Sequence, residues 1–236
     1  MKTIFHTAWI ILMGSLLVGA QEKNGFDLSN ATIPVDEIRG GGPPRDGIPA
    51  IDEPKWIGTT KAERFLNYRD RVVGLSRGGE HRAYPLRILV WHEVVNDTVG
   101  GQPVAVTYCP LCGTAMVFSR EAGGRALSFG VSGLLYNSDV LLYDRQTESL
   151  WSQLKAEAVS GPMVGTKLQW LASDHTDWKT WKNAHPDGKV LSRDTGFARD
   201  YGRDPYAAYH RSEETFFPVE RKRGDLPRKD WVAGVL

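Results

Sequence analysis

Two cysteines are the most chemically informative residues of the chain, and they lie in the segment Cys109-Pro110-Leu111-Cys112-Gly113. A Cys-x-x-Cys-Gly turn directs two thiolates at one metal ion, as in zinc ribbons and rubredoxins, because the glycine permits a left-handed backbone turn. Thiolate pairs favour copper and zinc, and iron is a further candidate. The pattern predicts one transition-metal ion, completed by histidine, carboxylate, methionine, water or another subunit.

Two other roles for the same cysteine pair stay open. A thiol-disulfide oxidoreductase would use an exposed Cys109 as nucleophile and Cys112 as resolving thiol. Against this role, such sites lower the thiol pKa at the start of a helix, and no helix is expected to begin at Cys109. A plain short-loop disulfide is the remaining alternative.

The segment around His92 supplies the expected third metal ligand. The order His92-Glu93-x-x-Asn96 resembles the His-Glu-x-x-His pattern of zinc proteases, but Asn96 replaces the second histidine, so a protease is not expected. His92 is therefore a candidate metal ligand or acid-base group, with a hydrogen-bonded core histidine as the alternative. Glu93 beside it is a candidate catalytic carboxylate.

A polar and aromatic stretch over residues 132–153 adds further candidates for catalysis. Asp139, Asp144 and Glu148 could provide paired carboxylates for acid-base chemistry. Ordinary turn chemistry is the favoured alternative, because Asn-Ser-Asp and Asp-Arg-Gln-Thr sequences are common in turns. We therefore treat Asp139 and Asp144 as candidates only.

The same stretch permits a non-catalytic function, a module that binds a small molecule or carbohydrate. Its aromatic platforms would be Tyr136, Tyr143 and Trp151. Two other features are better explained by structure than by function. Met116 is more simply interpreted as a core residue than as a soft copper ligand. Residues 199–206 are more simply interpreted as an ion-paired turn than as a binding loop.

The elements that must position these residues are mainly strands. In residues 104–109 alternate side chains face opposite ways, so that Ala105, Thr107 and Cys109 share one face and Cys109 ends a strand. Paired glycines between short apolar runs predict hairpins at Gly78-Gly79, Gly100-Gly101 and Gly123-Gly124. Further strands are expected over residues 72–76, 94–99, 114–120, 127–131, 140–143, 149–153 and 167–171. We expect a mainly β (α+β) fold with an antiparallel sheet, sandwich or barrel-like, and a few short helices.

Short helices are expected over residues 61–67, 86–93 and 177–184. Trp178 and Trp181 lie three positions apart in the last of these and would share one helical face. Ser173 or Asp174 is the expected N-cap.

The first twenty residues resemble a secretory signal peptide, with Lys2 before an apolar run from about Ala8 to Val18. Cleavage is expected after Ala20. A retained anchor is the alternative, but the run is shorter than the roughly 20 apolar residues that span a bilayer. We expect an exported protein, periplasmic or extracellular, with no stable membrane span after processing. Such compartments are oxidising, so unprotected thiols form disulfides there.

Composition divides the rest of the chain into three parts. Residues 21–55 form a Pro- and Gly-rich arm, which excludes long helices. Residues 56–210 are expected to form a single β-rich domain, and residues 211–236 a polar tail that packs on it. No Gly-Lys-Ser/Thr follows the glycines of the arm, so no nucleotide cofactor is expected.

Charge excludes one class of partner. Lys and Arg total 29 against 28 Asp and Glu, which leaves no field strong enough to recruit nucleic acid. A small-molecule substrate or ligand of unspecified kind is therefore the expected partner.

Five motifs together resemble a known family. They are GGPPRDGIPA (41–50), YPLRIL (84–89), WHEVVND (91–97), TYCPLCG (107–113) and SGLLYNS (132–138). The family is a group of exported bacterial and archaeal proteins classed as domain-of-unknown-function family 3179. The resemblance covers about Ile33 to Tyr209 and implies a single domain in an extracytoplasmic setting, without assigning an activity or catalytic residues.

Overall fold

The structure is a computed structural model that describes residues 21–220, 222–230 and 232. The expected signal peptide, residues 1–20, lies outside the described residues. Among the described residues we find no helix with the length and hydropathy that a membrane crossing requires.

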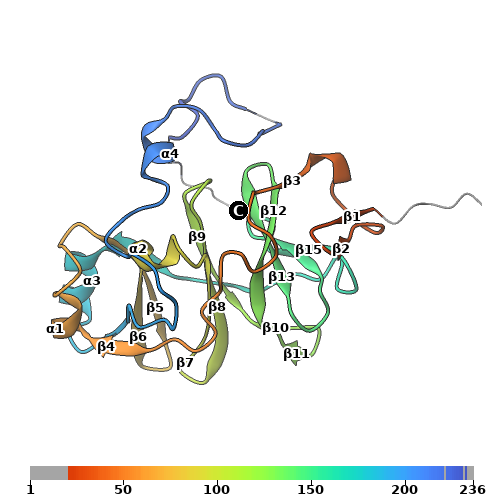
Figure 1. Ribbon diagram of the computed structural model, residues 1–236. Helices are drawn as coiled ribbons and strands as arrows, with labels where there is room; N and C mark the ends of the chain where they lie inside the picture. The colour runs from red at the N-terminus through yellow and green to blue at the C-terminus, as the bar shows by residue number, and fades with distance from the viewer. Residues whose placement is uncertain (1–20, 221, 231, 233–236) are drawn as a thin grey trace, which may run out of the picture.

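Three sheets make up the body of the protein and run side by side (Figure 1). The middle sheet has the order β16-β9-β8-β7, and its strands are β7 (Val94–Val99), β8 (Gln102–Cys109), β9 (Thr114–Ser119) and β16 (Trp170–Leu171). It carries the Cys-x-x-Cys turn between β8 and β9.

The second sheet has the order β15-β14-β13-β12-β3, and its strands are β3 (Ile38–Gly40), β12 (Phe129–Tyr136), β13 (Asp139–Asp144), β14 (Leu150–Ser152) and β15 (Glu157–Ser160). The third has the order β17-β5-β6-β18-β4, with β4 (Trp56–Gly58), β5 (Arg71–Arg77), β6 (Glu80–Pro85), β17 (Asp174–Asp177) and β18 (Lys189–Leu191). Two small hairpins complete the strands, β1 (Glu22–Lys23) with β2 (Phe26–Asp27), and β10 (Glu121–Ala122) with β11 (Arg125–Ala126).

The predicted fold class is confirmed, since antiparallel sheets dominate and the helices are short. Among the named strands that the structure describes, the pair β18 and β6 is parallel. Two strand predictions had the wrong length. The strand expected over 127–131 runs on to Tyr136, and the one expected over 167–171 is reduced to Trp170–Leu171.

The paired glycines form the turns of three hairpins, as predicted. Both members of each pair have positive φ, for example 54° at Gly78 and 78° at Gly79 between β5 and β6. Such values match the two-residue turns that join right-handed strands. At Gly100 a side chain would also meet the backbone of Arg77 at 2.5 Å, so glycine is required there for space as well.

Each face of the middle sheet packs against a different core. Val104, Val106 and Tyr108 contact the cluster formed with the third sheet, whereas Ala105 and Cys109 contact the cluster formed with the second sheet. The predicted alternation along β8 is therefore confirmed. Because both faces are covered, the Cys109 end of β8 is buried between two layers.

The helices are shorter than the sequence patterns predicted. They are α1 (Thr59–Ala62), α2 (Leu86–Leu89), α3 (Trp178–Ala184) and α4 (Ala207–Arg211), with a 3₁₀ turn at Val35–Glu37. The predicted N-cap of α3 was wrong. Asp177 is the cap, and its carboxylate accepts a hydrogen bond from Thr180 N at 2.8 Å, whereas Asp174 lies in β17.

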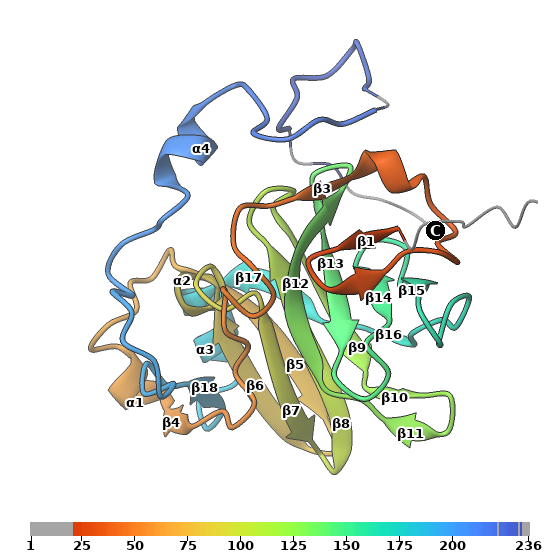
Figure 2. The same cartoon turned by 45° about the vertical axis from the view of Figure 1, so that its right-hand side comes forward.

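Two long segments cross the outside of the sheets (Figure 2). The N-terminal arm pairs with β12 through β3 and makes a parallel bridge between Ile51 and Val95. The C-terminal segment over residues 195–220, which we call the strap, contains α4 and passes above the ends of β9 and β12 (Figures 1 and 2).

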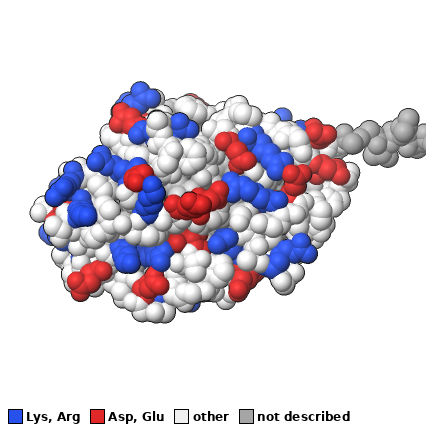
Figure 3. Space-filling view, turned by 60° about the horizontal axis from the view of Figure 1, so that its bottom comes forward, with Lys and Arg blue, Asp and Glu red and all other residues white. Residues whose placement is uncertain are grey.

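Charged side chains of both signs alternate over the face that Figure 3 shows. This mixture agrees with the near-zero net charge of the sequence. On this face no broad region of one sign stands out as a docking surface for a polyanion.

Candidate metal centre

The two cysteines lie at the turn that joins β8 to β9. Cys109 is the last residue of β8 and pairs with Thr114, the first residue of β9. Gly113 has a φ of 64°, a conformation that glycine adopts without a steric penalty. The turn between β8 and β9, which we call the knuckle, therefore has the glycine conformation that the sequence pattern predicted.

A second hairpin brings a carboxylate to this knuckle. β12 and β13 are joined at Asn137 and Ser138, which have φ values of 51° and 62°. Asp139 follows directly and begins β13. Cys109 Sγ, Cys112 Sγ and a carboxylate oxygen of Asp139 all lie within 4.8 Å of one another. We call these three residues the ligand group.

The ligand group is largely shielded from solvent. Cys109 is 1% exposed and Asp139 3% exposed, while Cys112 is half-buried. Cys112 Sγ lies 3.3 Å from Asp139 Oδ1, and no disulfide joins the cysteines. The other carboxylate oxygen, Oδ2, accepts a hydrogen bond from Leu154 N at 3.1 Å. This bond orients Asp139 toward the sulfurs, as outer partners of metal ligands do.

Burial controls the ionisation of these groups. Loss of water raises the pKa of Asp139 to about 6, although hydrogen bonds from Leu154 and Cys112 act in the opposite direction. Burial also raises the pKa of the Cys109 thiol well above its usual value, with further contributions from Cys112 and from the charges of Asp139 and Glu93. A free Cys109 is therefore a thiol at neutral pH.

Glu93 lies beside the ligand group. Its backbone has a φ of 58°, because the chain must reverse sharply between α2 and β7. Glu93 N donates to Leu89 O at 2.7 Å, and Glu93 O accepts from Tyr108 N at 2.8 Å. The carboxyl is buried, and its Oε1 lies 3.5 Å from Tyr206 OH. Burial, together with the charge of Asp139, raises the pKa of Glu93 to about 8 despite this hydrogen bond.

The acidic groups of this site have no basic neighbour to balance them. No ion pair between described residues involves Asp139 or Glu93. Two thiols and two carboxyls thus share a buried region without a Lys or Arg partner. In such a region either a bound cation neutralises the acidic groups, or these groups remain protonated.

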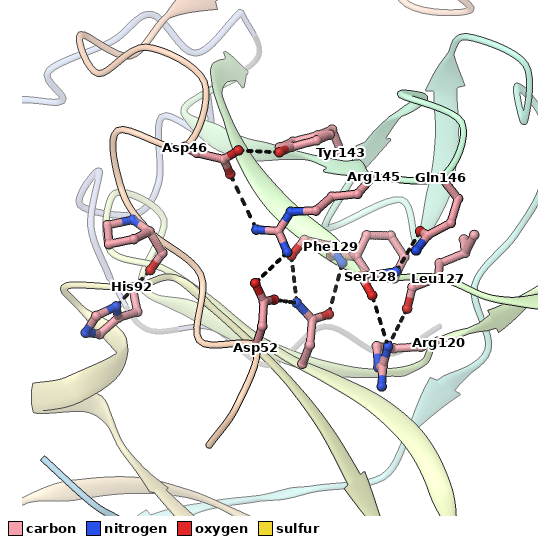
Figure 4. A network of polar contacts seen from close by, with 12 residues as sticks. Asp46, Asp52, His92, Arg120, Leu127, Ser128, Phe129, Tyr143, Arg145 and Gln146 are labelled. Atoms are coloured by element: carbon pink, nitrogen blue, oxygen red, sulfur yellow. Dashed lines mark hydrogen bonds and ion pairs between the residues drawn. The ribbon is translucent and has the colours of Figure 1, made fainter. Parts of the chain in front are cut away.

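His92 does not belong to the ligand group, and both of its ring nitrogens contact other residues. Nδ1 lies 2.8 Å from Pro49 O, which can only accept, so Nδ1 carries the proton in the neutral ring (Figure 4). Nε2 then accepts from Tyr201 OH at 2.7 Å. Burial lowers the pKa of His92. This geometry corresponds to the hydrogen-bonded core histidine that the sequence left as an alternative. A role of His92 as a metal ligand stays a prediction, and this geometry does not support it.

Asp144 forms the turn that was the favoured interpretation. Its carboxylate accepts from Thr147 N at 2.6 Å, from Thr147 Oγ1 at 2.7 Å and from Trp151 Nε1 at 2.9 Å. All of its described partners belong to its own hairpin, so Asp144 has a structural role here. Asn96 is likewise structural, since its side chain bonds Asp52 and both backbone groups of Phe129.

Two of the three aromatic platforms of the predicted binding module are not available on the surface. Trp151 is 0% exposed and Tyr143 1% exposed, so neither ring offers a face on which a ligand could stack in this structure. Tyr136 is half-buried. Met116 is buried in the cluster of the second sheet, in agreement with its interpretation as core.

A charged network near these residues fixes the N-terminal arm. Arg145 lies 2.7 Å from Asp52 and 3.7 Å from Asp46, and Asp46 also accepts from Tyr143 OH (Figure 4). Arg120 donates to Leu127 O at 2.6 Å. Both carboxylates face the guanidinium group of Arg145, whereas Asp139 and Glu93 have no such partner among the described residues.

The strap supplies residues that the sequence did not identify. Tyr201 contacts His92, Tyr206 contacts Glu93, and Tyr209 OH donates to Leu111 O within the knuckle at 2.7 Å. Ser138 Oγ also donates to Phe217 O at 2.9 Å. For residues 199–206 the sequence favoured an ion-paired turn over a binding loop, and no local pattern there signals that Tyr201 and Tyr206 reach His92 and Glu93.

Comparison with known proteins gives one match. Residues 45–236 match the family described as Protein of unknown function (DUF3179). No curated protein matches the chain. No solved structure matches it either. Because the matched region covers most of the sequence and includes four of the five motifs in full, the chain belongs to the DUF3179 family, as its motifs predicted.

Proposed function

We propose that the protein binds one transition-metal ion through Cys109, Cys112 and Asp139. The observation that carries the proposal is the convergence of these ligand atoms within 4.8 Å, from two hairpins of different sheets. The absence of a basic partner for Asp139 and Glu93 among the described residues supports it, because a bound cation would balance their charge.

The donor set favours zinc among the metals expected from the sequence. Zinc accepts thiolate and carboxylate ligands together, in tetrahedral sites. Copper(I) prefers soft thiolate and thioether donors, and the oxygen of Asp139 is a hard donor. Zinc is therefore the first ion to test, with copper(I) and iron(II) as competitors.

The test is metal analysis of the full chain together with a count of free thiols. We expect close to one zinc per chain and no disulfide in the wild type. Cys109→Ser, Cys112→Ser and Asp139→Asn should lose most of the metal, while Asp187→Asn, an exposed carboxylate, is the matched control. Circular dichroism establishes that each variant is folded. Unchanged metal content in the three ligand variants would overturn the proposal.

A redox function of the same cysteines is the second candidate. The close approach of Cys112 Sγ to Asp139 Oδ1 favours it, since a carboxylate there can accept the thiol proton. Cys109 is buried and Cys112 is the more exposed thiol, so exchange would begin at Cys112 rather than at Cys109. Oxidation of both thiols to a disulfide would reduce a substrate disulfide to two thiols. An insulin-reduction assay without turnover would exclude it.

Export belongs to the proposal because it sets the chemistry that the thiols must withstand. In an oxidising compartment a bound metal would protect Cys109 and Cys112 from forming a disulfide. Mass determination of the protein from fractionated cells tests this directly. A mature chain that begins at Gln21 outside the cytoplasm would support export, and a full-length cytoplasmic chain would contradict it.

A further inference from the structure

The ligand group provides three protein ligands, which matters for the fourth position of a tetrahedral ion. Structural zinc sites are generally closed by four protein ligands, whereas catalytic sites have three and leave one position to water or substrate. Among the described residues, Cys109, Cys112 and Asp139 are the group with ligand atoms close enough to share one ion. Glu93 is not a member of that group, although its charge acts on Cys109 and Asp139.

Glu93 is held in the position of an outer partner. It precedes β7 directly and lies across from Tyr108, the neighbour of Cys109, through the hydrogen bond between Tyr108 N and Glu93 O. A positive φ at a residue other than glycine is uncommon and costs free energy, so the fold must stabilise this conformation. The carboxyl is buried, and Tyr206 OH approaches its Oε1 to 3.5 Å, the one side-chain hydrogen bond of Glu93 among the described residues. The carboxyl therefore retains accepting capacity.

Gln153 provides a second, independent observation. It is fully buried, and its Nε2 donates to Thr107 Oγ1 at 2.8 Å and to Thr114 O at 3.4 Å. Thr114 pairs with Cys109, which places this amide in the layer next to the knuckle. Gln153 Oε1 is buried and has no hydrogen-bond partner among the described residues. An unpaired buried acceptor costs about 1–3 kcal/mol, so a donor at this place would be stabilising.

We propose that the metal ion keeps its fourth position for a water molecule, whose two hydrogens are accepted by Glu93 and Gln153. The inference rests on the proposed metal site. It makes the site an open one, in which Glu93 contacts the molecule bound at the metal. A metal ion promotes ionisation of such a water, and an adjacent carboxylate can accept its proton, which is the chemistry of metal-assisted hydrolysis or hydration.

The shielding of the ligand group limits the substrate class. The strap contacts the knuckle through Tyr209 and the neighbouring Glu93 through Tyr206, and Cys112 is the ligand with partial exposure. A substrate must therefore reach the metal with a small group, such as a terminal carbonyl or ester.

The experiment uses the full chain loaded with cobalt(II), a spectroscopic substitute for zinc. Electron paramagnetic resonance in water enriched in oxygen-17 reports a metal-bound water by broadening of the cobalt signal. We expect broadening in the wild type. Cobalt binding without broadening would overturn the inference and leave the proposed metal site intact, whereas failure to bind cobalt or zinc would overturn both.

A variant pair tests the part assigned to Glu93. The visible spectrum of the cobalt protein should change with pH as the bound water ionises. In Glu93→Gln the midpoint should fall by about one pH unit, because a neutral amide no longer disfavours hydroxide as a carboxylate does. Glu121→Gln, an exposed glutamate, is the matched control and should keep the wild-type midpoint. If Glu93 had only a structural role, Glu93→Gln would alter stability and leave the midpoint of the spectral change in place. That result would contradict the role assigned to Glu93.

Discussion

Asp97 and Asp139 are two buried aspartates on neighbouring sheets, and they differ in what surrounds them. Asp97 is 6% exposed and Asp139 3% exposed. Asp97 accepts from Arg82 Nη1 with both oxygens, at 2.6 and 2.7 Å, and from Tyr84 OH at 2.6 Å. Asp139 instead accepts from Leu154 N and faces the thiol of Cys112.

The difference teaches what burial alone does not reveal. A buried carboxylate is stable when a guanidinium balances it, as Arg82 balances Asp97. Asp139 has the same burial without such a partner, and burial accordingly raises its pKa to about 6. The Asp139 carboxyl is thus more readily protonated than that of an ordinary aspartate unless a cation binds beside it. We infer that Asp97 maintains the fold and that Asp139 serves the ligand group.

The largest effect is expected from breaking the balanced pair of Arg82 and Asp97. Asp97→Ala would leave Arg82 buried with Glu80 as its one remaining ion-pair partner among the described residues, and should lower the free energy of unfolding by about 3 kcal/mol. Asp139→Ala in metal-free protein should lower it by about 1 kcal/mol, the value of one hydrogen bond from Leu154. Urea unfolding of both variants, with metal removed by a chelator, measures the contrast. Equal losses would show that the two aspartates have the same role.

Metal addition should reverse the order of the two variants. Zinc at a hundred times its dissociation constant stabilises the folded state by about 2.7 kcal/mol in any protein that binds it at one site. We expect this gain in the wild type and in Asp97→Ala, and its loss in Asp139→Ala, because only Asp139 belongs to the ligand group. The measurement is the unfolding midpoint with and without zinc. A full zinc gain in Asp139→Ala would remove Asp139 from the site.

The pH dependence of the metal-free protein should report the unbalanced acids. The pKa of Glu93 is about 8 in the folded protein, raised from 4.5, so between these values the unfolded chain loses a proton that the folded chain keeps. Stability is therefore greatest below the lower value and falls as pH rises through this window. Between pH 6 and pH 8 the expected loss is about 2 kcal/mol.

Glu93→Gln separates this effect from the rest of the chain. The amide does not titrate, so the fall in stability between pH 6 and pH 8 should largely disappear. Asp139 contributes a separate fall in stability below about pH 6. Chemical unfolding across this range, with Glu121→Gln as the control, is the measurement. An unchanged slope in Glu93→Gln would mean that the carboxyl of Glu93 is ionised in the metal-free protein.

The same contrast explains what the sequence could and could not reveal. The strand that ends at Cys109 and the turn at Gly113 follow from neighbouring residues, through side-chain alternation and glycine chemistry, and both were predicted. Asp139 was named only as a candidate carboxylate. Its place in the ligand group depends on the packing of one hairpin beside another, which no local pattern encodes.

His92 shows the opposite difficulty. It is close to the knuckle in sequence order and has the right chemistry for a ligand, but its ring points to Pro49 and Tyr201. The backbone reverses at Glu93, so the side chains of His92 and Glu93 lie in different surroundings. This reversal requires a positive φ at Glu93, which residues other than glycine seldom adopt. Spacing therefore pointed to this segment, and within it the charge of Glu93, the residue after His92, acts on Cys109.

The smallest expected effect concerns the cover that the strap places over the unbalanced site. Tyr209→Phe removes the hydrogen bond to Leu111 O and should lower stability by about 1 kcal/mol. Because this bond joins the strap to the knuckle, its loss should favour local opening and speed zinc release about fivefold, with no change in the number of ions bound. Zinc transfer to an excess of chelator measures the rate. Tyr68→Phe, an exposed tyrosine far from the ligand group in sequence, is the control and should release zinc at the wild-type rate. Equal rates in all three proteins would show that the strap stabilises the fold without controlling access to the metal.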